Sequence, residues 1–138
     1  MKWIFFLIML GLTPFAQAND KLAKLCSHIS MVVEDATRYV KDGENIEWVD
    51  SYRGLEDVYG DKADFIQKDV KEFIMITSTT LTPELAGGFF LHACYNSYLQ
   101  NKGVIKELKQ YVRHYCPSGS NRVKACIDKS VKEYLIAK

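Results

Sequence analysis

Apolar side chains recur at the helical period of about 3.6 residues along most of this 138-residue chain. One stripe runs from about Asp20 to Lys41, and Gly43, just past its last apolar position, is typical of a residue that ends a helix. Further stripes predict helices that begin near residues 61, 82, 104 and 120. No stretch alternates for long enough with the period of two that a half-buried strand requires. We therefore predict an all-α fold, a compact bundle of about five helices.

Polar residues mark where three of these helices begin. Asp61 is suited to cap the second of them. Thr82 precedes Pro83 and Glu84, which combines an N-cap residue, a proline at the first helical position and an acid in the first turn. Ser120 is suited to cap the last helix.

The apolar pattern defines the helix after Asp61 clearly but leaves the segment before it open. Residues 44–60 are irregular and fit either a short helix or a loop packed on the core. The helix after Asp61 has a clear apolar face. The residues expected to be buried there are Phe65, Ile66, Val70, Phe73, Ile74 and Thr77.

Residues 1–18 have the pattern of a secretory signal peptide. A lysine at position 2 precedes the apolar run from Ile4 to Leu12, and Ala16 and Ala18 stand three and one residues before a cleavage point. An uncleaved membrane anchor is the alternative, but a run of about nine apolar residues is too short to cross a bilayer. We predict cleavage after Ala18, which leaves residues 19–138 as a single exported helical domain, unattached to the membrane.

All four cysteines lie after the predicted cleavage point, and an even number in a small exported domain indicates two disulfides. The sequence alone does not settle the pairing, but geometry narrows it if the two helices that meet at Gly103 form an antiparallel hairpin. Cys94 then lies about eight residues before the turn and Cys116 about thirteen after it, an axial offset of roughly 7 to 8 Å that is too long for a bridge. We therefore predict the pairs Cys26–Cys94 and Cys116–Cys126.

The chain lacks the short motifs that carry catalysis. Neither G-x-S-x-G, H-E-x-x-H nor a glycine-rich phosphate loop occurs in the sequence. Metal binding by Cys26 with His28, or by His92 with Cys94, is disfavoured because residues two apart on a helix point in different directions. A disulfide-bonded sulfur also cannot act as a nucleophilic thiolate. We expect no enzyme activity, no catalytic residue, no metal and no cofactor.

Composition and charge narrow the class of protein further. Hydrophobic residues make up 48% and charged residues 25%, as in ordinary globular domains, and a net charge of +1 does not favour nucleic-acid binding. Charge is uneven, because residues 19–84 contain fourteen acids and eight bases whereas residues 85–138 contain three acids and nine bases. This fits either two solvated faces of a bundle or a polar molecule that docks a charged protein or a second copy of itself.

The stretch from Phe89 to Tyr115 combines an aromatic-rich helix that carries Cys94, Asn96 and Tyr98 with a short turn and a lysine-rich helix. The second helix contains the pair Tyr111-Val112. This arrangement resembles the C-terminal half of the Tai family of type VI secretion amidase immunity proteins, and Cys26 stands where that family has its first cysteine. The resemblance covers positions 89–115 and Cys26, and does not extend to the helix after Ser120.

The resemblance implies a periplasmic, all-helical homodimer that binds a peptidoglycan-degrading amidase effector and blocks its active-site cleft with a projecting loop. A plain helix connector is the alternative for the corresponding turn, which consists of Leu99, Gln100, Asn101, Lys102 and Gly103. We predict an immunity protein of this kind. The alternatives are an acid-stress periplasmic chaperone that opens as carboxylates protonate, or another periplasmic binding or exclusion protein.

Overall fold

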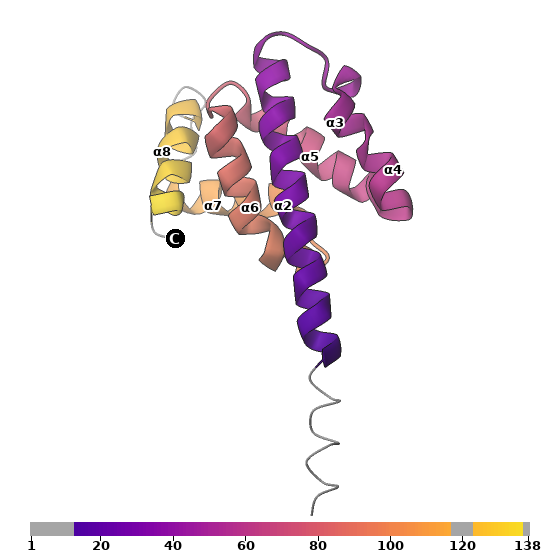
Figure 1. Ribbon diagram of the computed structural model, residues 1–138. Coiled ribbons are helices and arrows are strands. Elements are labelled where there is room, and N and C mark those ends of the chain that lie inside the picture. The colour runs from indigo at the N-terminus through magenta and orange to yellow at the C-terminus, as the bar shows by residue number, and fades with distance from the viewer. Residues whose placement is uncertain (1–12, 117–122, 137–138) are drawn as a thin grey trace, which may run out of the picture.

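The computed structural model describes residues 13–116 and 123–136, and these residues form a bundle of helices (Figure 1). No strand occurs in the two described ranges. The predicted all-α class is therefore confirmed. The five longer helices are α2 (Thr13–Lys41), α5 (Ala63–Thr77), α6 (Pro83–Leu99), α7 (Val104–Tyr115) and α8 (Val123–Ile136).

The first helix begins earlier than its apolar stripe predicted. α2 is already helical at Thr13, the first residue that the structure describes, and so begins well before Asp20, because the residue types at positions 16–18 have high or moderate helix propensity. It ends at Lys41, and Gly43 adopts a left-handed φ of +93°, which confirms the predicted stop. The part of the predicted signal peptide that precedes Thr13 lies outside the described residues.

The irregular segment between α2 and α5 is a series of short helical pieces, neither one helix nor an extended loop. In chain order these are η1 (Ile46–Trp48), α3 (Asp50–Arg53), α4 (Leu55–Tyr59) and η2 (Gly60–Lys62). The segment packs on the core through four buried side chains, which are Ile46, Val49, Tyr52 and Leu55.

Two details predicted for α5 are wrong. Asp61 does not cap this helix, because it lies inside η2 and the N–H of Ala63 bonds to the carbonyl of Gly60. The backbone thus supplies a partner that a capping side chain would have provided. Phe65 is 44% exposed although it was expected to be buried, because it lies at the edge of the apolar stripe, where its ring contacts Tyr98 edge-on.

α6 runs antiparallel to α2 through the centre of the bundle (Figure 1). Its start is as predicted, since the hydroxyl of Thr82 accepts a hydrogen bond from the N–H of Leu85 at 3.2 Å. The predicted Cys26–Cys94 disulfide is confirmed and joins the two helices, with 5.7 Å between the Cα atoms. The largest fully buried side chains near this interface are aromatic, namely Phe73, Phe89 and Phe90.

The two C-terminal helices complete the bundle. α8 packs against α6 and α7 and buries Ile127 and Val131. The second predicted disulfide, Cys116–Cys126, is confirmed with a Cα separation of 5.9 Å, and it ties the end of α7 to α8. The predicted cap Ser120 lies outside the described residues.

Candidate functional site

The turn between α6 and α7 carries the residues predicted to contact a partner. Leu99 ends α6, and α7 begins at Val104. Four residues of the turn are exposed and Gly103 is half-buried. Leu99 is 55% exposed, so the turn presents one apolar side chain beside the three exposed polar ones.

The backbone of this turn is closed by hydrogen bonds to the last turn of α6. Asn101 has a left-handed φ of +53°. Its N–H bonds to the carbonyl of Tyr98 at 3.1 Å, and the N–H of Lys102 bonds to the carbonyl of Ser97 at 2.8 Å. This pair of bonds is the Schellman arrangement, which satisfies carbonyls that a helix end otherwise leaves without partners. The path of the turn is therefore set by its own backbone.

A buried carboxylate from another helix holds the base of the turn. Asp69 in α5 is 3% exposed and accepts three hydrogen bonds. The donors are the Tyr98 hydroxyl at 2.9 Å, the N–H of Val104 at 2.8 Å and the N–H of Ile105 at 3.0 Å. Since Val104 and Ile105 begin α7, Asp69 caps this helix from across the bundle. It thereby joins the end of α6 to the start of α7.

Gly103 leaves the space that this contact needs. A Cβ atom at position 103 would lie 2.5 Å from Oδ1 of Asp69 and 2.9 Å from its Cγ. Both values are shorter than a van der Waals contact, so a larger residue would push the carboxylate away from the start of α7. Gly103 therefore allows the backbone at the start of α7 to approach the Asp69 carboxylate closely.

The surroundings of Asp69 and Tyr98 raise the pKa of both side chains. Burial raises the pKa of the Asp69 carboxyl, and the hydrogen bonds from Ile105, Val104 and Tyr98 lower it in part. Burial also raises the pKa of the Tyr98 hydroxyl, and the neighbouring Asp69 charge raises it further. Tyr98 therefore stays protonated and donates to Asp69. Because its three hydrogen bonds join the end of α6 to the start of α7, the Asp69 carboxylate has a structural role.

Two hollows flank the turn. A mainly apolar hollow of about 370 Å³ lies between α2, α5 and the end of α6, and a polar hollow of about 310 Å³ lies between α6 and α7. The apolar one is lined by Leu22, Leu25, Phe65, Ile66, Tyr98 and Asn101, among others. The polar one includes Gln100, Lys102, Lys106 and Glu107 in its lining. The turn thus stands between an apolar and a polar surface.

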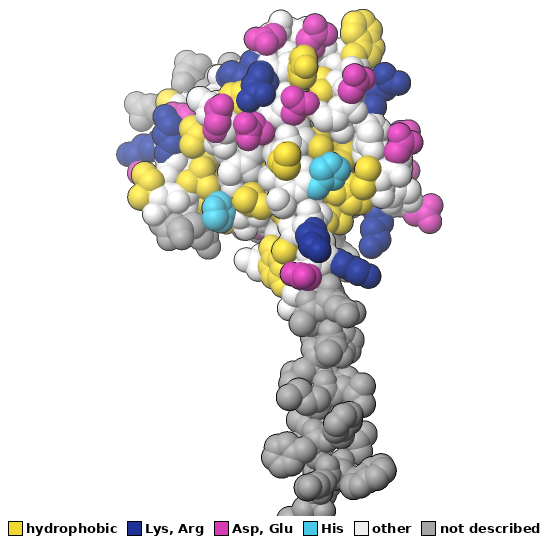
Figure 2. Space-filling view, in the orientation of Figure 1, with side chains coloured by type: hydrophobic (Ala, Val, Ile, Leu, Met, Phe, Trp, Pro, Cys, Tyr) yellow, Lys and Arg dark blue, Asp and Glu magenta, His cyan; other side chains and the backbone are white. Residues whose placement is uncertain are grey.

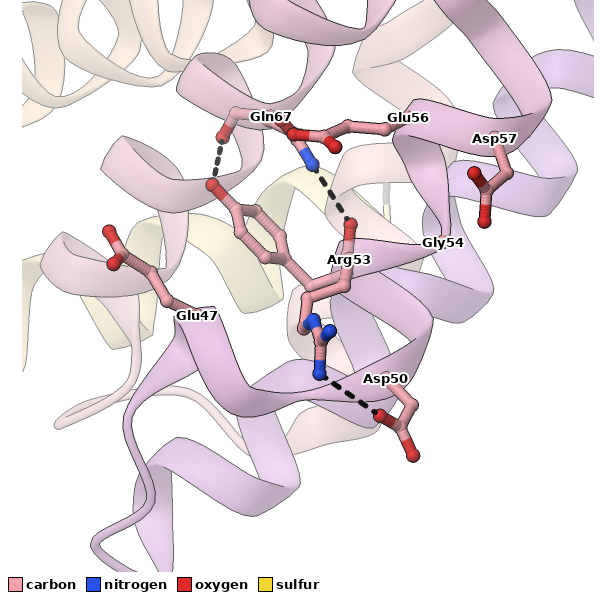
Figure 3. A pocket seen from close by; sticks show the side chains of 8 residues that line it. Glu47, Asp50, Arg53, Gly54, Glu56, Asp57 and Gln67 are labelled. Atoms are coloured by element: carbon pink, nitrogen blue, oxygen red, sulfur yellow. Dashed lines mark hydrogen bonds and ion pairs between the residues drawn. The ribbon is translucent and has the colours of Figure 1, made fainter.

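A larger hollow of about 650 Å³ lies elsewhere, between η1, α3, α4 and α5, and is rich in carboxylates (Figure 3). In Figure 3 the carboxylates of the four lining acids, Glu47, Asp50, Glu56 and Asp57, are spread around it and do not face one another. Arg53 lies 3.8 Å from Asp50. General acid–base catalysis by two carboxylates needs both to reach one substrate, and these four carboxylates do not converge.

The residues considered for nucleophilic or metal chemistry are bonded elsewhere or stand apart. All four cysteines form disulfides, so none supplies a thiolate. Nδ1 of His28 lies 2.6 Å from the Tyr59 hydroxyl on an exposed face. Within residues 13–116 and 123–136, no group of three or more His, Cys, Asp or Glu side chains is arranged to hold a metal ion. No helix among these residues is long and apolar enough to span a membrane.

Comparisons of the chain with protein-family models, with curated proteins and with solved structures find no match.

Sequence reasoning identified the turn but missed Asp69. A signal was present, because Asp69 falls on the apolar stripe of α5 beside Ile66, Val70 and Phe73. A carboxylate at such a position must find hydrogen-bond donors inside the protein. The sequence does not say which donors, since Val104 lies 35 residues away.

Proposed function

We propose that this protein is a periplasmic immunity protein that binds a peptidoglycan-degrading amidase effector of a type VI secretion system and occludes its active-site cleft. The observation that carries the proposal is the turn from Leu99 to Gly103, which is exposed at its tip and held at its base by Asp69. The resemblance over residues 89–115 supports the proposal, since this turn corresponds to the projecting loop of the Tai family.

A turn held in this way suits inhibition by occlusion. Association costs about 0.5–1.5 kcal/mol for each rotamer-rich side chain that becomes ordered, together with the cost of ordering loops. The hydrogen bonds from Asn101 and Lys102 to α6, and those from α7 to Asp69, already define the backbone here. Binding then requires little further ordering of the chain. The inhibitor needs no reactive group of its own.

The surface around the turn has the composition of a protein interface. Leu99 and the apolar hollow beside Asn101 offer area that gains from burial, and Gln100 and Lys102 offer hydrogen bonds at the rim. An apolar centre with a polar rim is common in protein complexes. We propose that these residues contact the effector directly.

Export is part of this proposal. Two disulfides fit an oxidising compartment, and cleavage after Ala18 would release the domain into the periplasm. The side chains of residues 19–21, which directly follow the proposed cleavage point, are exposed, and the first buried side chain after that point is Cys26. The resemblance also leads us to propose a homodimer, which light scattering after size-exclusion chromatography would measure.

A co-expression experiment tests the proposal. A peptidoglycan amidase encoded beside this protein is directed to the periplasm together with the wild type, Leu99→Asp or Val58→Asp. Both substitutions place a charge at an exposed apolar position, since Leu99 is 55% and Val58 59% exposed. We expect the wild type and Val58→Asp to prevent lysis and to co-purify with the amidase. Leu99→Asp should lose both properties, because its charge would be buried in the complex.

Two outcomes would count against the proposal in different ways. If the wild type neither rescues the cells nor forms a complex, the immunity function is wrong. If Leu99→Asp rescues as well as Val58→Asp does, the turn is not the contact surface.

A further inference from the structure

Two aromatic side chains are exposed at the end of the molecule opposite the turn. Trp48 in η1 is 73% exposed, and Tyr39 near the end of α2 is 47% exposed. Together with Asp35, Glu44 and Asp50 they line a hollow of about 230 Å³, which we call the aromatic–acidic hollow. Because α2 and α6 run antiparallel, this hollow near the C-terminal end of α2 is remote from the turn at the C-terminal end of α6 (Figure 1).

The indole of Trp48 is held outwards by the structure of η1. The side chain of Asn45 accepts a hydrogen bond from the N–H of Glu47 at 3.0 Å and so caps the short helix. Ile46 and Val49 on either side of Trp48 are each only 4% exposed, which anchors η1 to the core. The Glu47 carboxylate is also paired with Lys71 of α5. Trp48 is thus exposed on an anchored segment, as interface anchors often are.

The charge around these rings is negative. Asp35, Glu44 and Asp50 contribute three carboxylates, and no Lys or Arg stands among the described residues that line the hollow. The nearby Lys41 is directed to the carbonyls of Ser78 and Leu81. Figure 2 shows acidic side chains at this end of the molecule beside apolar ones, with Lys and Arg side chains among them. A cationic group therefore complements the hollow.

The contacts that Asp35 and Asp50 already make leave both carboxylates able to accept hydrogen bonds from a ligand. Asp35 accepts a hydrogen bond from the Ser51 hydroxyl at 2.5 Å through one oxygen, and a carboxylate has further lone pairs. Asp50 pairs with Arg53 at 3.8 Å, but the Asp50 side chain is fully exposed and such a surface pair is weak.

We infer that the aromatic–acidic hollow binds an arginine side chain from a basic segment of a partner protein. A guanidinium group stacks on an indole or phenol face and donates paired hydrogen bonds to carboxylates at the same time. An ammonium group lacks this planar fork, so lysine fits less well. The site is separate from the turn and does not depend on the immunity function.

The size of the hollow favours a side chain over a free small molecule. Pockets for small molecules usually measure about 300–1,000 Å³, and this hollow is about 230 Å³. An exposed tryptophan beside a small hollow is instead typical of a contact point for another protein. We therefore assign the hollow to a protein partner.

Trp48 itself reports binding. The chain has two tryptophans, so in the full chain with Trp3→Phe excitation that is selective for tryptophan over tyrosine reports Trp48 alone. The probe is a capped peptide of alternating glycine and arginine, compared with the same peptide made with lysine. We expect the arginine peptide to change the Trp48 emission saturably, and the lysine peptide to bind several-fold more weakly.

A matched pair of double variants distinguishes the hollow from the general negative charge. Glu44→Gln with Asp50→Asn removes two charges from the hollow, and Glu56→Gln with Asp57→Asn removes two charges next to it. We expect the first pair to weaken binding about tenfold and the second pair by less than about twofold. An emission that does not respond to the arginine peptide, equal losses in the two double variants, or equal binding of the two peptides would each overturn the inference.

Discussion

At the scale of single residues, Asp69 fixes the base of the turn, where α6 ends and α7 begins. A buried carboxylate without partners costs several kcal/mol, and here Tyr98, Val104 and Ile105 supply the donors. Gly103 completes the arrangement because any Cβ would collide with the carboxylate. These residues act as one unit, since a change in one leaves another crowded or without its hydrogen bond.

Asn101 allows a prediction at the same scale. Its φ of +53° is tolerated by asparagine, is free of strain for glycine and costs about 1 kcal/mol for residues such as alanine. We expect Asn101→Ala to lower the free energy of unfolding by about 1 kcal/mol and Asn101→Gly to leave it nearly unchanged. Urea denaturation followed by circular dichroism measures both variants. Equal stability of the alanine variant and the wild type would contradict the left-handed turn.

At the scale of elements, the helices with strong local signals were the easiest to predict. Thr82 and Pro83 defined the start of α6, and Gly43 defined the end of α2. The prediction that Asp61 caps α5 was wrong because a helix can also begin from a preceding 3-10 turn, in which a backbone carbonyl accepts the hydrogen bond from the first N–H. The segment 44–60 remained open because short helical pieces are too brief to show a period.

The two disulfides should contribute unequally to stability. Cys26–Cys94 closes a loop with a sequence separation of 68 and lies in the core, whereas Cys116–Cys126 closes one of 10. In the chain-entropy model these loops contribute about 4 and about 3 kcal/mol. We expect Cys26→Ala with Cys94→Ala to be the more destabilised double variant, because it also loses buried sulfur contacts. Denaturant unfolding of the two double variants gives the order, and the reverse order would refute the prediction.

At the scale of the whole molecule, stability depends on the protonation of Asp69. The pKa of the Asp69 carboxyl is raised above its ordinary value of 3.8 in the folded protein. Between the ordinary and the raised pKa, the folded state therefore binds more protons than the unfolded state. The stability contributed by this group therefore rises as pH falls through that window and is lost as pH rises. Opening driven by acid, which a chaperone function requires, would have to come from other carboxylates.

A titration of stability tests this direction. Asp69→Asn does not titrate, so we expect the wild type to gain stability relative to this variant as pH falls from about 7 to about 4. Asp57→Asn, at an exposed position, serves as the control for a lost surface charge. The measurement is the urea midpoint of each protein across this range. A difference between wild type and Asp69→Asn that stays constant with pH would show that the pKa of Asp69 is not raised.

The sequence by itself determined the helical class, the longer helices and the location of the turn, and it narrowed the cysteine pairing, which the tertiary structure then decided. These features follow from periodicity, from capping residues and from spacing, which are local properties of the chain. Only the tertiary structure decided that Asp69 caps α7 and that Trp48 and Tyr39 share one hollow. Such contacts join residues far apart in sequence, and their partners are set by how the helices pack.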